Sequence, residues 1–199
     1  LVAGAPGRNR KAAARVESTT IARLAVGPEC KALVKVFFGM EAAKKKFRGA
    51  GREGGIRRAG VLSAGVMGGA IASVMAEKGI ATRLFDISPE GLDAAVIRHR
   101  AELAKKKRRR RMERHAHDAA VDRLTTSSEL IGFQTAELVV EAVAEILEVK
   151  HDVLGKLADC CAEDTILATN TSSLSVDDIA RELANPERVV GMHFFNPVR

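Results

Sequence analysis

From residue 56 onward, short apolar runs alternate with segments whose apolar residues recur at helical spacing. Runs of this length and composition are typical of buried parallel strands, and the longer periodic segments are typical of amphipathic helices. Because strands and helices alternate, we expect an α/β fold with a doubly wound parallel sheet and right-handed crossovers. The expected strands are residues 59–62, 80–85, 124–126, 138–143, 165–168 and 188–192. The expected helices are 66–78, 88 to the basic run at 105–111, 112–124 (separate, or the continuation of one bent helix), 147–161 and 176–183.

The first 55 residues follow a different pattern. Residues 1 to about 20 carry Gly, Pro and charges without a sustained apolar period, so we expect them to be flexible. A helical pattern begins at Pro28 and continues to the basic stop at 44–46, followed by a glycine-rich linker at 49–55. The helix has an apolar face, which predicts docking on the following domain or on a domain outside this sequence. We therefore divide the chain into a flexible tail with a connector helix, residues 1–55, and an α/β domain, residues 56–199.

A glycine-rich corner joins the first strand to its helix at residues 63–69, SAGVMGG. Gly65 has no Cβ, so a pyrophosphate can approach the backbone, and the free N–H groups of the following helix point at that anion. Gly68 allows the helix to pack closely on the strand, and Gly79 ends the helix. Asp86 stands at the tip of the second strand, where a carboxylate can accept hydrogen bonds from both ribose hydroxyls of NAD and would repel the 2′-phosphate of NADP. The order of strand, glycine corner, helix, strand and acid therefore predicts a Rossmann-type site for NAD.

Ser63 departs from the G-x-G-x-x-G pattern because it stands where the first glycine makes the tight turn. We expect serine to make this turn only if its φ angle stays negative, and we expect weakened cofactor binding. The alternative is a tight helix–strand corner in an unrelated α/β protein. The cofactor contacts predicted at the corner are Ser63, Gly65, Val66, Met67, Gly68 and Asp86.

Composition limits the remaining possibilities. The chain of 199 residues is 46% hydrophobic and can bury a core, and it carries no Trp or Tyr. Cys30, Cys160 and Cys161 follow no metal-ligand or redox spacing, so we expect no metal site and a reduced, cytoplasmic setting. No apolar run approaches the length of a membrane span. The sequence begins with Leu1 in an Arg- and Ala-rich stretch that also fits a transit-like segment, and we expect a fragment of a longer protein.

Polar residues interrupt the pattern at the points where the expected strands end. They lie at the glycine corner and at residues 144–145, 169–173 and 193–197. In a doubly wound sheet the ligand binds beyond the carboxyl ends of the strands. These turns are therefore the expected site.

Four segments, SAGVMGG, VVEAVAEILEVK, ILATNTSSLSV and GMHFFNPV, resemble the L-3-hydroxyacyl-CoA dehydrogenases, particularly the dehydrogenase part of the multifunctional fatty-acid oxidation α subunit. The resemblance covers residue 56 to the end, and AVGPECKALVKVFFGMEAAKKK resembles the connector between the hydratase and dehydrogenase parts of those enzymes. It implies a Rossmann-type fold that is incomplete at its C-terminus. It also implies NAD-dependent oxidation of (S)-3-hydroxyacyl-CoA to 3-oxoacyl-CoA in β-oxidation.

The resemblance assigns three catalytic residues. It makes His193 the base that takes the proton of the 3-hydroxyl group, and the near-neutral pKa of an imidazole suits that exchange. It makes Ser172 and Asn196 hydrogen-bonding residues around the reacting oxygen. Without the flanking FFNP, a structural role would be favoured for His193. From the residues alone, Ser172 could be a helix N-cap and Asn196 a turn residue before Pro197.

The resemblance places Glu145, Lys150 and Asn170 on the cofactor side. Without it, Glu145 and Lys150 would be an ordinary surface pair. Ile146 replaces the asparagine usual in the family, which removes one expected polar contact. Within the basic run, the resemblance suggests that Lys106 meets the phosphates of coenzyme A, while the alternative is a solvated helix face.

Family members continue beyond the HFFNP motif with a glutamate that orients the histidine and with a C-terminal helical domain that forms the dimer. The resemblance thus implies an acyl-CoA substrate and, within a fatty-acid oxidation complex, a thiolase-type partner. We expect this chain alone to bind NAD weakly and to turn over little substrate. Two rivals remain: a binding-only Rossmann remnant without catalysis, and a basic module that binds nucleic acid, although the chain shows no specific nucleic-acid motif and no aromatic stacking platform.

Overall fold

The computed structural model describes residues 9–46 and 54–198 and divides the chain into two compact units, Leu1–Glu53 and Gly54–Arg199. The sequence analysis placed the domain boundary at residue 55, after the glycine-rich linker, and that boundary stays a prediction. None of the helices among the described residues is long and apolar enough to cross a membrane.

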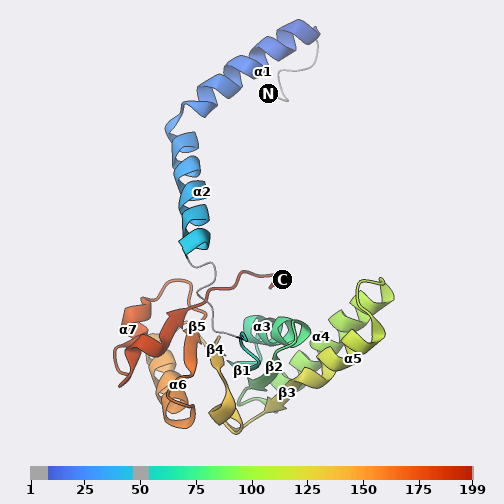
Figure 1. The fold of residues 1–199 in the computed structure, drawn as a ribbon, viewed down its shortest axis with the longest axis vertical. Helices are drawn as coiled ribbons and strands as arrows, with labels where there is room; N and C mark the ends of the chain where they lie inside the picture. The colour runs from blue at the N-terminus through green and yellow to red at the C-terminus, as the bar shows by residue number, and fades with distance from the viewer. Residues whose placement is uncertain (1–8, 47–53, 199) are drawn as a thin grey trace. The chain divides into compact units, whose positions relative to one another are not determined.

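The first unit contains two helices, α1 (Arg10–Ala25) and α2 (Pro28–Lys46) (Figure 1). The prediction of a flexible segment was wrong for residues 10–20, and residues 1–8 lie outside the described part. The Asn9 side chain caps α1 by accepting from the Ala12 N–H at 2.9 Å, and α1 contains no Gly or Pro. The helix therefore forms from caps and propensity, without the apolar period on which the prediction relied.

Helix α2 matches its prediction at both ends. Pro28 occupies its first position, where the missing N–H costs no hydrogen bond, and the three lysines at 44–46 occupy its last turn. No residue of α2 is buried, and Phe37 and Phe38 are about 60% exposed (59% and 64%). The expected docking of this apolar face stays a prediction.

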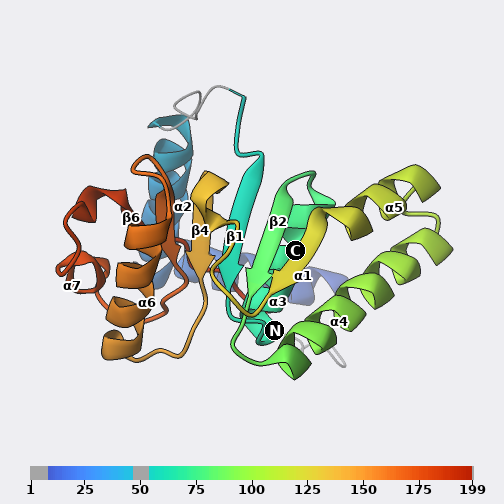
Figure 2. The same cartoon turned by 90° about the horizontal axis from the view of Figure 1, so that it is seen from below.

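The second unit is a six-stranded parallel sheet in the order β3-β2-β1-β4-β5-β6 (Figures 1 and 2). The strands are β1 (Arg58–Leu62), β2 (Ala81–Phe85), β3 (Leu124–Ser127), β4 (Leu138–Glu141), β5 (Ile166–Thr169) and β6 (Val189–Gly191). This order is that of the doubly wound dinucleotide-binding fold, and it reverses between β1 and β4. The predicted fold class is confirmed.

Helices cover both faces of the sheet. They are α3 (Val66–Glu77), α4 (Pro89–Arg108), α5 (Arg114–Arg123), α6 (Leu147–Cys160) and α7 (Val176–Ala180), with short 3₁₀ turns η2 (Phe133–Thr135) and η3 (Pro186–Arg188). One core cluster joins α3 and α4 to alternate strand residues such as Val61 and Val140. The other joins α6 and α7 to the intervening residues, such as Leu62 and Val139. The side-chain alternation of each strand therefore supplies two cores, one on each face.

Helices α4 and α5 are separate, which decides between the two alternatives for the basic segment. Ser88 caps α4 by accepting from the Gly91 N–H at 3.1 Å, and Pro89 takes the first position, as predicted. Gly79 follows the end of α3 with φ +97°, so it ends that helix as expected.

The strand register aligns the ends of the strands. Ser127, Phe85, Leu62, Glu141, Thr169 and Gly191 form one continuous row of partners across the sheet. Neighbouring strands lie about 4.8 Å apart, so the loops that follow this row begin side by side. The polar turns identified in the sequence all leave from this single edge.

Candidate active site

The glycine corner forms the turn that the sequence predicted, but Ser63 makes it with a φ of +82°. The expectation of a negative φ was therefore wrong. The Ser63 N–H donates to the Phe85 carbonyl oxygen at 2.8 Å, which fixes the turn between β1 and β2. A left-handed conformation costs a non-glycine residue about 1–2 kcal/mol, so the turn is kept at the expense of local strain. The Ser63 hydroxyl lies 3.3 Å from the Gly65 nitrogen and accepts its N–H.

Helix α3 begins directly after this turn, with Gly65 as its N-cap. Its first intrahelical bond runs from Gly69 N–H to the Gly65 carbonyl oxygen at 3.0 Å, which leaves the preceding N–H groups, including those of Val66 and Met67, without i−4 acceptors. A Cβ on Gly68 would lie 1.9 Å from the Ser63 carbonyl oxygen, so only glycine allows this close packing of helix on strand. We call the backbone amides of residues 65–68 the amide cradle. It fits a diphosphate because N–H groups and the positive end of the helix dipole face the same point.

Asp86 leaves β2 beside the cradle and holds it in place. One carboxylate oxygen accepts the Ala64 N–H at 2.6 Å and the other accepts the Ser88 N–H at 2.9 Å. Each oxygen has a second lone pair, so these bonds leave acceptor capacity for ribose hydroxyls. A carboxylate at this place is compatible with the ribose of NAD and would repel the 2′-phosphate of NADP.

A second cluster lies at the ends of β4 and β5, the two strands that follow β1 in the sheet, and its innermost residues are buried. Glu141, Lys150 and Thr169 are each fully buried, and the Lys150 ammonium lies 2.8 and 3.0 Å from the two Glu141 oxygens. The interpretation of Lys150 as part of a surface pair was therefore wrong. Sequence reasoning did not single out Glu141, and it included Thr169 only as part of the polar turn at residues 169–173. The available signal was a single carboxylate ending the apolar run LVVE, where a buried charge requires a partner.

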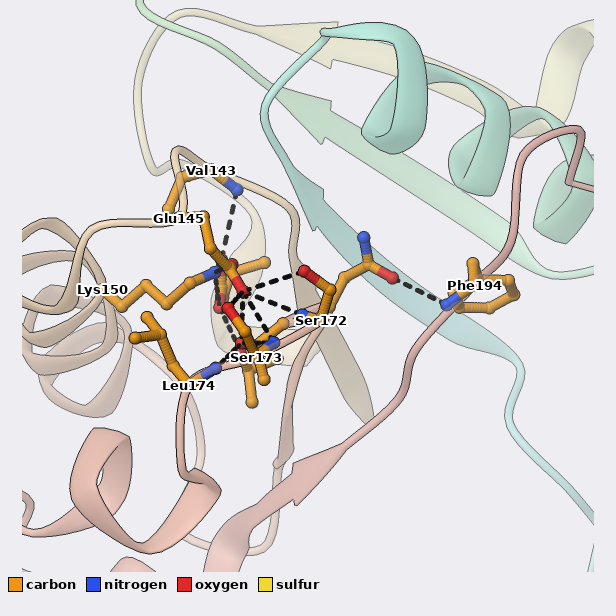
Figure 3. Close-up of polar contacts among 11 residues, drawn as sticks. Val143, Glu145, Lys150, Ser172, Ser173, Leu174 and Phe194 are labelled. Atoms are coloured by element: carbon orange, nitrogen blue, oxygen red, sulfur yellow. Dashed lines mark hydrogen bonds and ion pairs between the residues drawn. The ribbon is translucent and has the colours of Figure 1, made fainter.

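Glu145 forms the exposed part of this cluster (Figure 3). Its Oε1 accepts the Thr171 hydroxyl at 2.6 Å and the N–H groups of Ser172 and Ser173 at 2.8 and 3.2 Å. Its other oxygen lies 3.4 Å from the Lys150 ammonium. Burial acts to raise the pKa of Glu145, but these hydrogen bonds and the lysine charge outweigh burial and lower its pKa to about 2. Glu145 is therefore an anion that holds the turn after β5.

Ser172 lies in that turn, with its hydroxyl 3.3 Å from Glu145 Oε1. The N-cap of α7 is Ser175, whose hydroxyl accepts the Asp178 N–H at 3.2 Å, so the interpretation of Ser172 as a helix cap was wrong. The Ser172 side chain is exposed at the sheet edge and available to a ligand.

His193 follows β6, and the residues before and after it are hydrogen-bonded to the end of β5 and to the turn that follows β5. The Met192 N–H donates to the Thr169 carbonyl oxygen at 2.9 Å, and the Phe194 N–H donates to Asn170 Oδ1 at 2.8 Å (Figure 3). The imidazole is exposed, stacks obliquely on Phe195 at 4.7 Å between ring centroids, and forms no hydrogen bond with any described residue. This exposure disfavours the structural-histidine alternative.

The segment that carries His193 also packs on the sheet face that α3 covers. Phe194 and Val198 pack against the core cluster that contains Ala64, next to the cradle, and Ile71 of α3. Asn196 lies in the same segment, exposed, at a bend before Pro197. The structure therefore brings the predicted cofactor and catalytic residues to one edge of the sheet.

Lys106 is separate from this edge. Its ammonium binds Glu77 at 2.5 Å, and Glu77 is the last residue of α3, whose first turn is the cradle. Twelve residues of helix span about 18 Å, so Lys106 lies roughly one helix length from the cradle. Its predicted contact with coenzyme A stays a prediction.

Ile146 is the N-cap of α6 and makes no side-chain cap bond. The side chain of an asparagine at this position could accept an N–H of the first turn, which isoleucine cannot do. The start of α6 therefore lacks the polar contact that the sequence analysis expected Ile146 to remove.

The sequence profile for the NAD-binding domain of 3-hydroxyacyl-CoA dehydrogenase matches residues 58–199, nearly the whole second unit. The chain belongs to this family. The chain is similar to the fatty acid oxidation complex subunit alpha of Shewanella baltica strain OS155. The two sequences are 40% identical over 188 residues. That alignment covers 92% of the chain and 26% of the relative, so the chain spans about a quarter of the length of this relative.

Solved structures agree with the dehydrogenase family. The 3-hydroxybutyryl-CoA dehydrogenase of Escherichia coli K12 is similar at 39% identity and a TM-score of 0.70, over 72% of this chain and 30% of that one. FadB2 of M. tuberculosis is similar at 34% identity and a TM-score of 0.68, over 72% of this chain and 50% of that one. The family and the cradle together point to NAD as the cofactor of this domain.

Proposed function

We propose that this domain carries out the NAD-dependent oxidation of (S)-3-hydroxyacyl-CoA to 3-oxoacyl-CoA in fatty-acid β-oxidation, as part of a larger enzyme. The observation that carries the proposal is the clamp around His193. Hydrogen bonds to Thr169 and Asn170 hold an exposed imidazole at the sheet edge that also carries the amide cradle. The names of the similar proteins support the substrate class.

The residues of the chain take distinct parts in this reaction. The cradle binds the diphosphate of NAD and Asp86 binds its ribose, and bound NAD supplies a hydride acceptor. His193 takes the proton of the 3-hydroxyl as the C3 hydride leaves, so the products are the 3-oxo group, NADH and one proton. Ser172 and Asn196 hydrogen-bond the reacting oxygen and orient it toward His193.

An assay in the reverse direction tests this proposal. The purified chain, mixed with acetoacetyl-CoA and NADH, should lower NADH absorbance, and His193→Ala should lower that rate at least 100-fold because the proton donor is lost. His115→Ala is the matched control, because His115 is an exposed histidine on α5, away from this edge. A rate unchanged in His193→Ala would contradict the proposed role.

A second candidate is a binding-only remnant that holds the cofactor without turnover. The strained Ser63 with its φ of +82° favours this candidate, because it shows a departure at the position where the motif requires glycine. NADH binding without consumption by the wild-type chain would support the remnant. Salt-sensitive binding of mixed oligonucleotides without NADH binding would instead support the basic-module alternative.

The setting of the enzyme is part of the same proposal. We propose a cytoplasmic location, which suits the three free thiols of the chain, and assembly with a thiolase-type partner within an oxidation complex. The relative's name, as a complex subunit, supports that assembly.

A further inference from the structure

Glu141 is a fully buried carboxylate to which the proposed reaction assigns no part. Its Oε1 accepts from the Lys150 ammonium and the Thr169 hydroxyl, and its Oε2 accepts from the same ammonium at 3.0 Å and from the Val143 N–H at 3.1 Å. Two lone pairs on each oxygen are thereby used. No capacity remains for a ligand, so Glu141 can influence the site only through its partners.

Lys150 is the partner that connects Glu141 to the surface. Its side chain has no exposed area, and its ammonium lies between the two carboxylates, 2.8 Å from Glu141 and 3.4 Å from Glu145. A buried ammonium must keep its charge partners, because removing one leaves an uncompensated charge. Glu141 therefore fixes the position of the Lys150 ammonium, and that ammonium in turn determines the position of the Glu145 carboxylate.

Glu145 in turn organises the turn that presents Ser172. One of its oxygens receives the Thr171 hydroxyl and two backbone N–H groups, and the Thr171 oxygen accepts the Leu174 N–H at 3.0 Å. Figure 3 shows the bonds from Ser172 and Ser173 converging on the Glu145 carboxylate. The turn has no regular secondary structure, so this carboxylate is its main support.

We propose that Glu141 is a positioning residue that, through Lys150, holds Glu145 and thereby fixes the turn carrying Ser172. Lys150 acts by the same route and does not itself contact the cofactor, because its ammonium is enclosed by carboxylates. The proposal deepens the proposed function, since it rests on Ser172 meeting the substrate oxygen.

Amide hydrogen exchange of the 199-residue chain, measured without substrate or cofactor, tests the proposal. Glu141→Gln keeps the size of the side chain and removes its charge, so Lys150 is left with Glu145 alone. Exchange at the Ser172 and Ser173 N–H groups should accelerate at least tenfold. The N–H groups of Ala64 and Ser88, which donate to Asp86, form an equivalent carboxylate clamp on another loop and should not change.

Two further variants complete the test. Glu148→Gln, at an exposed position on α6, is the matched control and should leave all four amides unchanged. Thr169→Val removes one hydrogen bond to Glu141 with little change in volume and should accelerate Ser172 and Ser173 about threefold, which covers the case in which Glu141→Gln fails to fold. Unchanged exchange at these two amides in the folded variant, or an equal rise at the Asp86 clamp, would overturn the proposal. Because the experiment measures amide exchange and not turnover, its result does not depend on whether the chain catalyses the proposed reaction.

Discussion

At the scale of single residues, Ser63 shows how the domain tolerates a substitution in its cofactor loop. The backbone turn survives because Ser63 keeps its bond to Phe85, although φ is positive. The side chain, however, enters the cradle and takes the Gly65 N–H. The weakening of cofactor binding stays a prediction, and the structure gives it a different basis: the Gly65 N–H is occupied by the Ser63 hydroxyl, whereas the turn itself is kept.

Ser63→Gly should therefore relieve strain and free an amide. We expect the free energy of unfolding to rise by about 1 kcal/mol and NADH affinity to rise severalfold, measured by urea unfolding and by NADH fluorescence. Ser63→Ala separates the two effects, because it frees the Gly65 N–H and keeps a Cβ at positive φ. It should tighten NADH binding without added stability. A less stable Ser63→Gly variant with unchanged affinity would contradict this account.

At the scale of elements, the sequence predicted the strands and helices that are marked by an apolar pattern or by helix-start and helix-stop residues. The strand expected at 138–143 was found as β4, over Leu138–Glu141, because its branched apolar run suits a buried strand, and α4 was found from Ser88 and Pro89. Helix α1 was missed because it buries no residue and so has no apolar period to detect. Lys150 was misjudged because a Glu–Lys spacing of five does not reveal depth. Lys150 is buried because its ammonium pairs with Glu141, which lies on β4 beside α6.

The junction of α3, α4 and α5 makes a prediction about pH. His99 is buried, its Nε2–H donates to the Ala120 carbonyl oxygen at 3.1 Å, and its Nδ1 accepts the Ser73 hydroxyl at 2.7 Å. Burial lowers the pKa of His99, although the Ala120 bond and Glu77 act to raise it, and Arg100 and His117 add to the lowering. The neutral ring is therefore the native form. The unfolded chain takes up the proton first as pH falls, so stability is retained above about pH 6.5 and is lost below it.

Urea unfolding at pH 7.5 and pH 5.5 measures this effect. The wild-type chain should lose more stability on acidification than His99→Gln, which cannot titrate. Glu145, with a pKa of about 2, stays ionised across this range and does not contribute. Equal losses in both proteins would show that His99 does not control the pH dependence of this junction.

At the scale of the whole molecule, the domain places the amide cradle and the His193 imidazole on one sheet edge. The topology does this in two steps: the register aligns the strand ends in one row, and the segment after β6 returns toward α3. The basic stretch at the end of α4 lies apart from this edge, since Lys106 pairs with the last residue of α3. A cofactor bound as we describe should therefore contact the edge and leave that stretch untouched.

The most direct test of this arrangement is a titration of the isotope-labelled chain with NADH, followed by the amide and imidazole NMR signals. We expect the amides of Gly65, Val66 and Met67 and the ring of His193 to shift with a single dissociation constant. The amides of residues 107–111 should not move. Shifts of the cradle without His193, or shifts confined to residues 107–111, would contradict the central claim that cradle and imidazole serve one site.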